Sequence, residues 1–314
     1  MPTIHNLQAH NHHIRPAAPP ARPQPAPQNR PEPRDQVELS PEAVRSCYTP
    51  PNESNDFVRD CREDRTPEVR QRQEATIRGA LQSGGQPFEL QNSAGQRESY
   101  TLRAGESGNY ELRGQDGHTL NISLDERMSE SDRVRALASI SDFQSRIPAH
   151  QRDALDYVTV TNDAYPTSNG TLEGFARRSS ITIYEGNRYL DNGVLDHEFG
   201  HVLGHKLVLQ EMMDASTVSG DGGAMLGAVL FSSNTPLGWR GAVDRDGRAP
   251  SQYARDNGAG EDFAESYVAY REAQEEGPEA VEALRRQYPE RVRYLEEVMT
   301  PPRTFFSSIF EGLW

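Results

Sequence analysis

Four short segments between residues 86 and 125 alternate apolar and polar side chains, with a glycine-containing turn between each segment and the next. Strict alternation is typical of a strand with one buried face, and short turns join neighbouring strands antiparallel. The four segments are PFELQ, ESYTLR, NYELRG and HTLNISL. A chain with this pattern has to place one face of a β-meander against a core, which excludes an all-helical fold.

Helical periodicity flanks the meander on both sides. Before it, Ser40-Pro41 and Thr66-Pro67 each place an N-cap residue ahead of a proline, which predicts two helix starts. The second of these helices is expected to run to about Leu81. After the meander the sequence predicts helices near 129–147, 192–209, 260–275 and 278–299 and strands at 157–160 and 180–184. Together these elements predict an α+β fold.

Composition divides the chain into three regions. Residues 1–38 are rich in Pro, Gln and Arg without apolar periodicity, which predicts a disordered tail. Residues 39–125 form a predicted accessory region of helices and the β-meander, and residues 126–314 hold the remaining elements. Cys47 and Cys61 are too few for a disulfide framework and are expected to be reduced thiols.

The chain is acidic, with 47 Asp and Glu residues against 33 Lys and Arg and a net charge of −14. Such a surface is repelled by phosphate backbones, so we expect no nucleic-acid partner. Residues 150–314 alone hold 26 acidic and 15 basic residues, a net charge of −11. No apolar run approaches the roughly 18 residues that a membrane-spanning helix requires, so no membrane span is expected.

One short motif, His197-Glu198-Phe199-Gly200-His201, carries the pattern His-Glu-x-x-His inside the predicted helix 192–209. Residues four apart lie on one face of a helix, so both imidazoles can reach one metal ion. Zinc favours imidazole nitrogen in tetrahedral sites. Glu198 would lie beside the ion, where its carboxylate can take a proton from a bound water as general base.

A catalytic zinc site needs a third protein ligand and an open fourth position. One option is His205, one helical turn after His201. An imidazole so far along a straight helix would reach the ion only if the helix broke at Gly204.

The other option is a carboxylate on the predicted helix 260–275. Glu261 stands at its start, and Asp262 beside it is the rival ligand. Glu265 lies one turn after Glu261 on the same face. It could accept a hydrogen bond from the far nitrogen of a ligating histidine and so fix the orientation of that imidazole.

Two blocks, HEFGH and, about fifty residues later, SQYARDNGAGEDFAESY, together resemble the catalytic domain of the anthrax lethal factor family. That family is a branch of the gluzincin metalloproteases, with the pattern HExGH, a tyrosine in a short loop, and E-x-F-A-E on a helix. The resemblance covers roughly residues 150 to 300. It implies zinc ligands at His197, His201 and Glu261, a general base at Glu198, and a hydrogen bond from Tyr253 to the tetrahedral intermediate.

The resemblance implies a zincin-like metalloprotease domain over residues 126–314, with an active-site helix and an edge strand before it that pairs with extended substrate. We place that edge strand at 180–184. The expected activity is hydrolysis of peptide bonds in a protein substrate by a zinc-dependent endopeptidase. The acidic catalytic region predicts basic residues near the scissile bond. Two alternatives remain: a catalytically degenerate protease fold used as a binding or adaptor protein, and an intracellular housekeeping metallopeptidase.

The expected location follows from the N-terminal segment MPTIHNLQAHNHHIRP, which lacks the apolar core of a classical secretory signal. Proteases of the family act on host or competitor proteins, and a Pro/Gln-rich tail is easily threaded by a one-step secretion machine. We therefore expect a secreted or translocated effector or toxin, with the bacterial cytoplasm as the alternative. Lys206 is the only lysine among the 33 basic residues. Because lysine accepts ubiquitin, its scarcity would prolong the lifetime of the protein in a host cytosol, with Lys206 expected to be hidden on the active-site helix. Base composition is the competing explanation.

Overall fold

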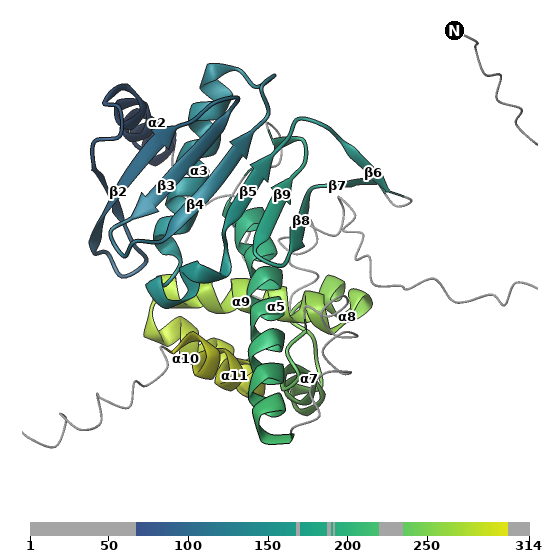
Figure 1. Cartoon of the computed structure of the whole chain (residues 1–314). Coiled ribbons are helices and arrows are strands. Elements are labelled where there is room, and N and C mark those ends of the chain that lie inside the picture. Colours follow the sequence, from purple (N-terminus) through teal and green to yellow (C-terminus); the bar gives the residue numbers. More distant parts are fainter. Residues whose placement is uncertain (1–66, 168–169, 187–189, 191, 220–234, 301–314) are drawn as a thin grey trace, which may run out of the picture. The chain divides into compact units, whose positions relative to one another are not determined.

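A seven-stranded mixed sheet organises the described part of the chain (Figure 1). The computed structural model describes residues 67–167, 170–186, 190, 192–219 and 235–300. The predicted tail at 1–38, the predicted helix after Ser40 and both cysteines therefore lie outside the described residues. The strands follow the spatial order β1 (Phe88–Gln91), β2 (Arg97–Ala104), β3 (Asn109–Gly114), β4 (Thr119–Leu124), β5 (Tyr157–Val160), β9 (Ser180–Ile183) and β8 (Gly174–Arg177).

The predicted meander is confirmed as strands β1 to β4, which pair antiparallel in sequence order. It does not stand apart from the rest of the chain, because β4 pairs in parallel with β5, with Ile122 beside Val158. Both of these side chains are buried on the same side of the sheet. A boundary at residue 125 therefore separates two sequence patterns but does not divide the sheet.

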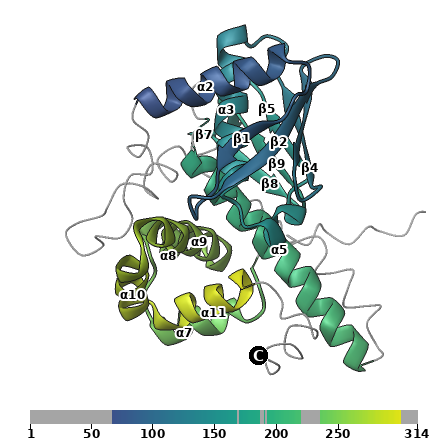
Figure 2. The ribbon, with the colours of Figure 1, turned by 90° about the vertical axis from the view of Figure 1, so that its left-hand side faces the viewer.

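Helices α2 (Pro67–Gln82) and α3 (Glu130–Arg146) lie together against one face of the sheet (Figure 2). The α3 helix begins where the Ser129 side chain accepts a hydrogen bond from the Asp132 amide, as an N-cap does. The predicted end of α2 is also confirmed: Gly84 and Gly85 follow it with φ of 67° and 93°, which glycine adopts without steric cost. A 3-10 turn, η1 (Ala149–Ala154), leads from α3 into β5.

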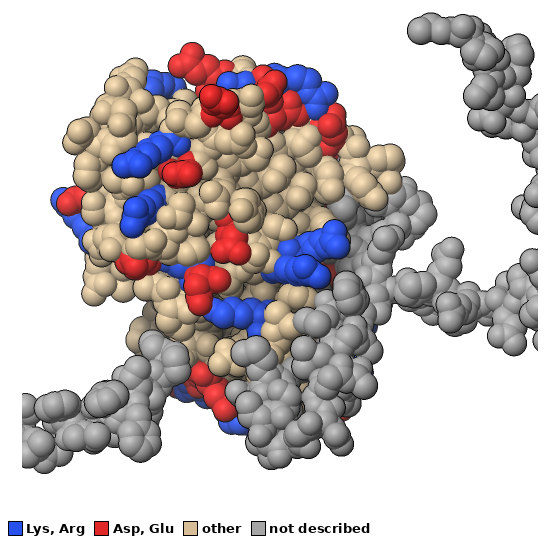
Figure 3. Space-filling view, viewed as in Figure 1, with Lys and Arg blue, Asp and Glu red and all other residues tan. Residues whose placement is uncertain are grey.

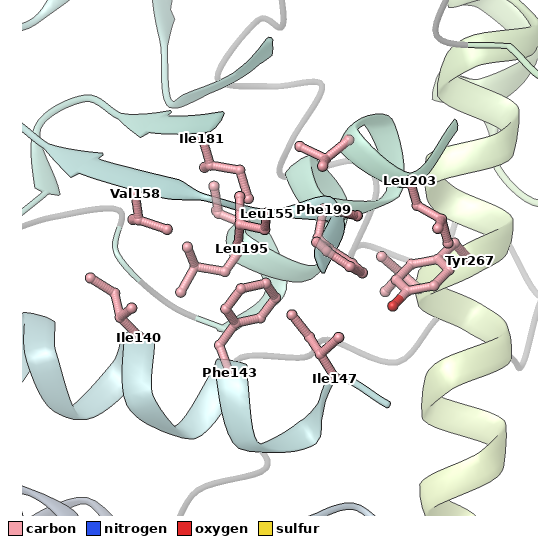
Figure 4. Close-up of a cluster of buried hydrophobic side chains, with 14 of the residues drawn as sticks. Ile140, Phe143, Ile147, Leu155, Val158, Ile181, Leu195, Phe199, Leu203 and Tyr267 are labelled. Atoms are coloured by element: carbon pink, nitrogen blue, oxygen red, sulfur yellow. The ribbon is translucent and has the colours of Figure 1, made fainter. Parts of the chain in front are cut away.

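Helix α5 (Asn192–Ser219) carries one side of its first turns into the core between the sheet and α3 (Figure 4). Leu195, Phe199 and Leu203 are spaced four residues apart and are all buried. The Phe199 ring packs edge-on against Phe143 of α3, with ring centroids 5.8 Å apart. The helix begins where predicted but extends about ten residues beyond the predicted end at 209.

Five further helices lie within the described residues 235–300: α7 (Trp239–Asp246), α8 (Gln252–Asn257), α9 (Ala259–Glu276), α10 (Pro278–Gln287) and α11 (Pro289–Met299). The single helix predicted over 278–299 is wrong, since Pro289 cannot continue α10 and instead begins α11. The short α7 and α8 were not predicted, because the glycine-rich sequence around them has little apolar periodicity. No helix in the described ranges is long and apolar enough to cross a membrane.

The predicted edge strand requires a correction. Strand β9, which corresponds to the predicted strand at 180–184, lies between β5 and β8 and is not at the edge. The edge next to α5 is instead β8, joined to β9 by a tight turn in which Arg178 has φ of 54°. Its residues GFAR were missed because Gly174 and Ala176 occupy the inward positions and give no apolar alternation. The preceding hairpin of β6 (Tyr165–Thr167) and β7 (Gly170–Leu172) was missed as well.

Candidate metal centre

Three buried side chains from two helices converge at the first turns of α5. His197 and His201 project from α5, and Glu261 projects from the first turn of α9. The Glu261 Oε2 atom lies 3.1 Å from His197 Nε2 and 3.2 Å from His201 Nε2, and the two imidazole nitrogens are 3.2 Å apart. Within the described residues these three form a group that could hold a metal ion.

The triangle of donor atoms fits a bound cation. Ligands about 2.0–2.1 Å from a tetrahedral zinc stand about 3.3 Å from one another. The three separations of 3.1–3.2 Å match that spacing closely. A proton can bridge only two of the three atoms at once, whereas a central cation attracts all three. Two imidazoles and one carboxylate are a donor set that suits zinc.

The charges of the triad are strongly coupled. Burial alone would raise the pKa of Glu261, but the two histidines hold it at about 2. Burial alone would lower the pKa of His201, but Glu261 and other nearby carboxylates raise it to about 9. Without a metal the pocket thus favours a protonated imidazole beside an ionised carboxylate. A divalent cation would replace that proton.

A glycine lets the two ligand helices approach closely enough to form the triangle. A Cβ atom built on Gly200 would lie 2.8 Å from the Cα of Ala264 and 3.1 Å from its Cβ. Because the nearest atom is backbone, no side-chain rotation could relieve that contact. The Gly of HEFGH and the Ala of EDFAE are therefore explained by the packing of α5 on α9.

Asp196, directly before the first ligand, ties α5 to two other helices from the opposite side. Its carboxylate lies 2.8 Å from the Arg146 guanidinium of α3 and 3.6 Å from the Arg271 guanidinium of α9. All three side chains are largely buried. Breaking a buried ion pair is costly, by about 3–5 kcal/mol, because it leaves a charge without compensation. The network therefore fixes the position of the helix turn that carries the first histidine.

Glu198 lies under the edge strand β8. A Cβ atom on Gly174 would come within 2.5 Å of its Oε1 atom, so only glycine allows the strand to pass so close. The Ala176 amide donates a hydrogen bond to the Glu198 carboxylate. Burial raises the pKa of Glu198 to about 8, and the charge of Glu261 adds to that shift. The side chain can therefore hold or release a proton near neutral pH.

Tyr253 of α8 also reaches the site. Its ring is buried, and the ring centroid lies 6.4 Å from that of His197. The helix that carries it starts at Ser251, whose hydroxyl accepts from the Ala254 amide and donates to Glu265 Oε2. The charge of Glu265 is among those that raise the pKa of His201, so this carboxylate also acts on a ligand. Ser251 thus connects the tyrosine helix to the ligand helix.

Two rival ligands do not join the triad. His205 continues α5 without a break at Gly204 and is not part of the metal-binding group. Asp262 accepts hydrogen bonds from Nε and Nη2 of the buried Arg291 guanidinium at 2.8 and 2.7 Å, and from the Trp239 indole N–H at 3.0 Å. Its carboxylate is committed to that network, which leaves Glu261 as the candidate carboxylate ligand.

We expect Ser251→Ala to lower the free energy of unfolding by about 2 kcal/mol, because it removes an N-cap and a donor to a buried carboxylate. Ser251→Thr retains the hydroxyl and should stay close to the wild-type chain. Urea unfolding of both variants measures the difference. Equal stability of the two variants would show that the hydroxyl contributes nothing.

Several residues around the site were not predicted from the sequence. Gly174 and Asp196 were missed, as were Arg146, Arg271 and Ser251, because their roles depend on contacts between distant segments. One signal was present for Asp196, an acidic residue inside an otherwise apolar run directly before the motif. A buried position there requires a cationic partner.

No family model, no curated protein and no solved structure matches this chain.

Proposed function

We propose that this chain is a zinc-dependent endopeptidase. The observation that carries the proposal is the buried triangle of His197, His201 and Glu261 at 3.1–3.2 Å, with Glu198 on the same helix under an open strand edge. The fold that we infer with it is zincin-like, and the resemblance of HEFGH and EDFAE to the lethal factor family belongs to the same proposal.

In the proposed reaction, a zinc ion held by the triad would supply Lewis acidity that makes water acidic enough to lose a proton near pH 7. Glu198 takes that proton at its carboxylate and delivers it to the leaving amine nitrogen. Burial raises the pKa of Glu198, and a divalent cation held by the triad would lower that pKa again, which leaves the carboxylate ionised to accept the proton. Burial of the carboxylate keeps bulk water from competing for the proton.

Tyr253 is proposed to donate its phenol hydrogen to the oxyanion that forms at the attacked carbonyl. The proposal is supported by the burial of the Tyr253 ring, whose centroid lies 6.4 Å from that of the His197 ring. A neutral donor stabilises the developing charge without adding a charge of its own.

We expect Tyr253→Phe to lower kcat by about 10²-fold, with KM and zinc content near those of the wild type, because only the hydroxyl is lost. Steady-state kinetics on a peptide substrate with parallel metal analysis checks this result. An unchanged kcat would remove Tyr253 from the mechanism.

The substrate is proposed to lie extended along β8 and to add a strand at the edge of the sheet, where no other strand of the described residues pairs with β8. The net charge of −11 over residues 150–314 favours basic residues in the segment around the cleaved bond through long-range attraction. Many of these acids are paired inside the protein, as Asp196 and Asp262 are, so the attraction is weaker than the charge alone suggests.

We propose translocation to a host or competitor cell as the context of this activity. The presence of only one lysine among the 33 basic residues supports the proposal, because few lysines leave few sites for ubiquitin attachment. Lys206 itself is not hidden, since its side chain is 32% exposed and pairs with Asp153. The comparison of half-lives in host cytosol between the wild type and variants with added surface lysines tests this part.

The proposed activity is tested by incubating the purified chain with a peptide library, with and without a chelator, and then restoring zinc. We expect cleavage that the chelator abolishes and zinc restores. A chain that binds zinc but cleaves no peptide would favour the alternative of a binding or adaptor protein.

A further inference from the structure

The edge of β8 faces the site directly. Backbone hydrogen bonds lie in the plane of a sheet, and the Ala176 amide donates to Glu198 instead of to a neighbouring strand. On its other side β8 pairs with β9. A peptide that extends the sheet at β8 would therefore pass beside the Glu198 carboxylate.

The side chains of β8 alternate between two faces. Gly174 and Ala176 point toward Glu198, whereas Phe175 and Arg177 are exposed on the opposite face. Phe175 is 40% exposed despite its apolar ring. Both exposed side chains can therefore contact the side chains of a peptide strand that pairs with β8.

The side chains of β9 next to Phe175 and Arg177 are short and do not cover them. Phe175 stands beside Thr182, and Arg177 stands beside Ser180, both short hydroxyl side chains of β9. Figure 3 shows this face of the sheet, where charged side chains gather along the upper rim and are sparse over its centre. In the described residues no ion pair engages Arg177, and the adjacent Arg178 adds a second positive charge.

Side chains directly opposite each other on paired strands interact on the same face of the sheet. An added strand would place two residues, separated by one, against Phe175 and Arg177. An apolar or aromatic residue is favoured opposite a phenylalanine, and a carboxylate opposite an arginine. Each such pair changes affinity by about 1.5- to 5-fold, and a charge reversal changes it further.

We propose that β8 selects substrates that carry an acidic residue opposite Arg177 and an apolar residue opposite Phe175, two positions apart. The inference rests on the proposed peptidase function and names the substrate segment that the site accepts. At the position opposite Arg177 the proposed preference is acidic, in contrast to the general preference for basic residues that the net charge favours. Phe175 and Arg177 would then be specificity-determining residues, remote from the proton transfer itself.

The test measures kcat/KM for a good peptide substrate in which each position is replaced in turn by Glu, Lys, Leu or Gly. For the wild type we expect one position that prefers Glu over Lys by about tenfold, and a second, two residues away, that prefers Leu over Gly by a few-fold. Arg177→Glu should invert the first preference, and Phe175→Ala should remove the second.

Matched controls lie on the same face of the sheet. Arg113→Glu changes an exposed strand arginine on β3, and Tyr157→Ala removes an aromatic side chain that is 55% exposed on the interior strand β5. Both controls should leave the preferences unchanged. Preferences that survive Arg177→Glu and Phe175→Ala, or a wild type without them, would overturn the inference while leaving the peptidase proposal intact. Failure of the wild type to cleave any peptide would instead count against the peptidase proposal and, with it, this inference.

Discussion

Replacement of Glu198 by glutamine is expected to lower kcat by about 10²–10⁴-fold, while the protein keeps its zinc and its fold. Glutamine has nearly the same size but cannot accept the proton. The contact with the Ala176 amide survives, because the amide oxygen of glutamine also accepts hydrogen bonds. The side chain is not one of the three converging ligands, so metal content should not change.

The control for this variant is Glu211→Gln on the same helix. Glu211 accepts hydrogen bonds from the Tyr294 hydroxyl and the Leu237 amide, away from the triad. Glu211→Gln removes one negative charge from α5, as Glu198→Gln does, but Glu211 has no role in the proposed reaction. The kcat of this variant should therefore equal that of the wild type. Undiminished proteolysis by Glu198→Gln at normal zinc content would contradict the assignment of the general base.

Gly200→Ala is expected to disturb the whole site without removing any of its donor atoms. Helix propensity alone would favour alanine by about 1 kcal/mol. The contact of 2.8 Å between the new Cβ and the Ala264 backbone destabilises the folded chain, and this steric cost should exceed the gain in helix propensity. We expect a net loss of about 1–3 kcal/mol of stability and zinc binding weakened by about 10- to 10²-fold, because α5 and α9 are pushed apart.

The same change at Gly241 of α7 provides the matched control. A Cβ there would meet only the flexible Arg245 guanidinium, at 3.2 Å or more. Stability should stay the same or rise by up to about 1 kcal/mol, with zinc binding unchanged. Urea unfolding and competitive zinc titration measure both variants. Equal behaviour of Gly200→Ala and Gly241→Ala would show that the close helix packing does not govern the site.

The main elements of the fold could be predicted from local pattern. The meander strands, α3 and β5 follow clear periodicities of two or 3.6 residues, and their bounds agree with the prediction to within about two residues. The inward positions of β8 are Gly174 and Ala176, which give no apolar alternation, and the six residues of α8 are too few to show helical periodicity. The joining of β4 to β5 depends on a parallel pairing between distant segments, which local pattern does not reveal.

The candidate ligands could also be predicted, because a fixed spacing on one helix brings His197 and His201 together. The resemblance already favoured Glu261 over its rival Asp262, and the structure adds the pairing of Asp262 with Arg291. The roles of Gly174 and Asp196 depend on which strand and which helices lie against α5. Such contacts form in three dimensions and leave no spacing signal along the chain.

The most direct test of the account is to determine how much zinc the full chain holds and which atoms bind it. Metal analysis of the purified protein, with X-ray absorption at the zinc edge, should give one zinc per chain. The ion should be bound by two imidazole nitrogens and a carboxylate oxygen at about 2.0–2.1 Å. Glu261→Ala and His197→Ala should lose the ion, and Asp153→Ala should keep it. A chain that retains no zinc in micromolar free zinc, or that binds it through other residues, would contradict the account.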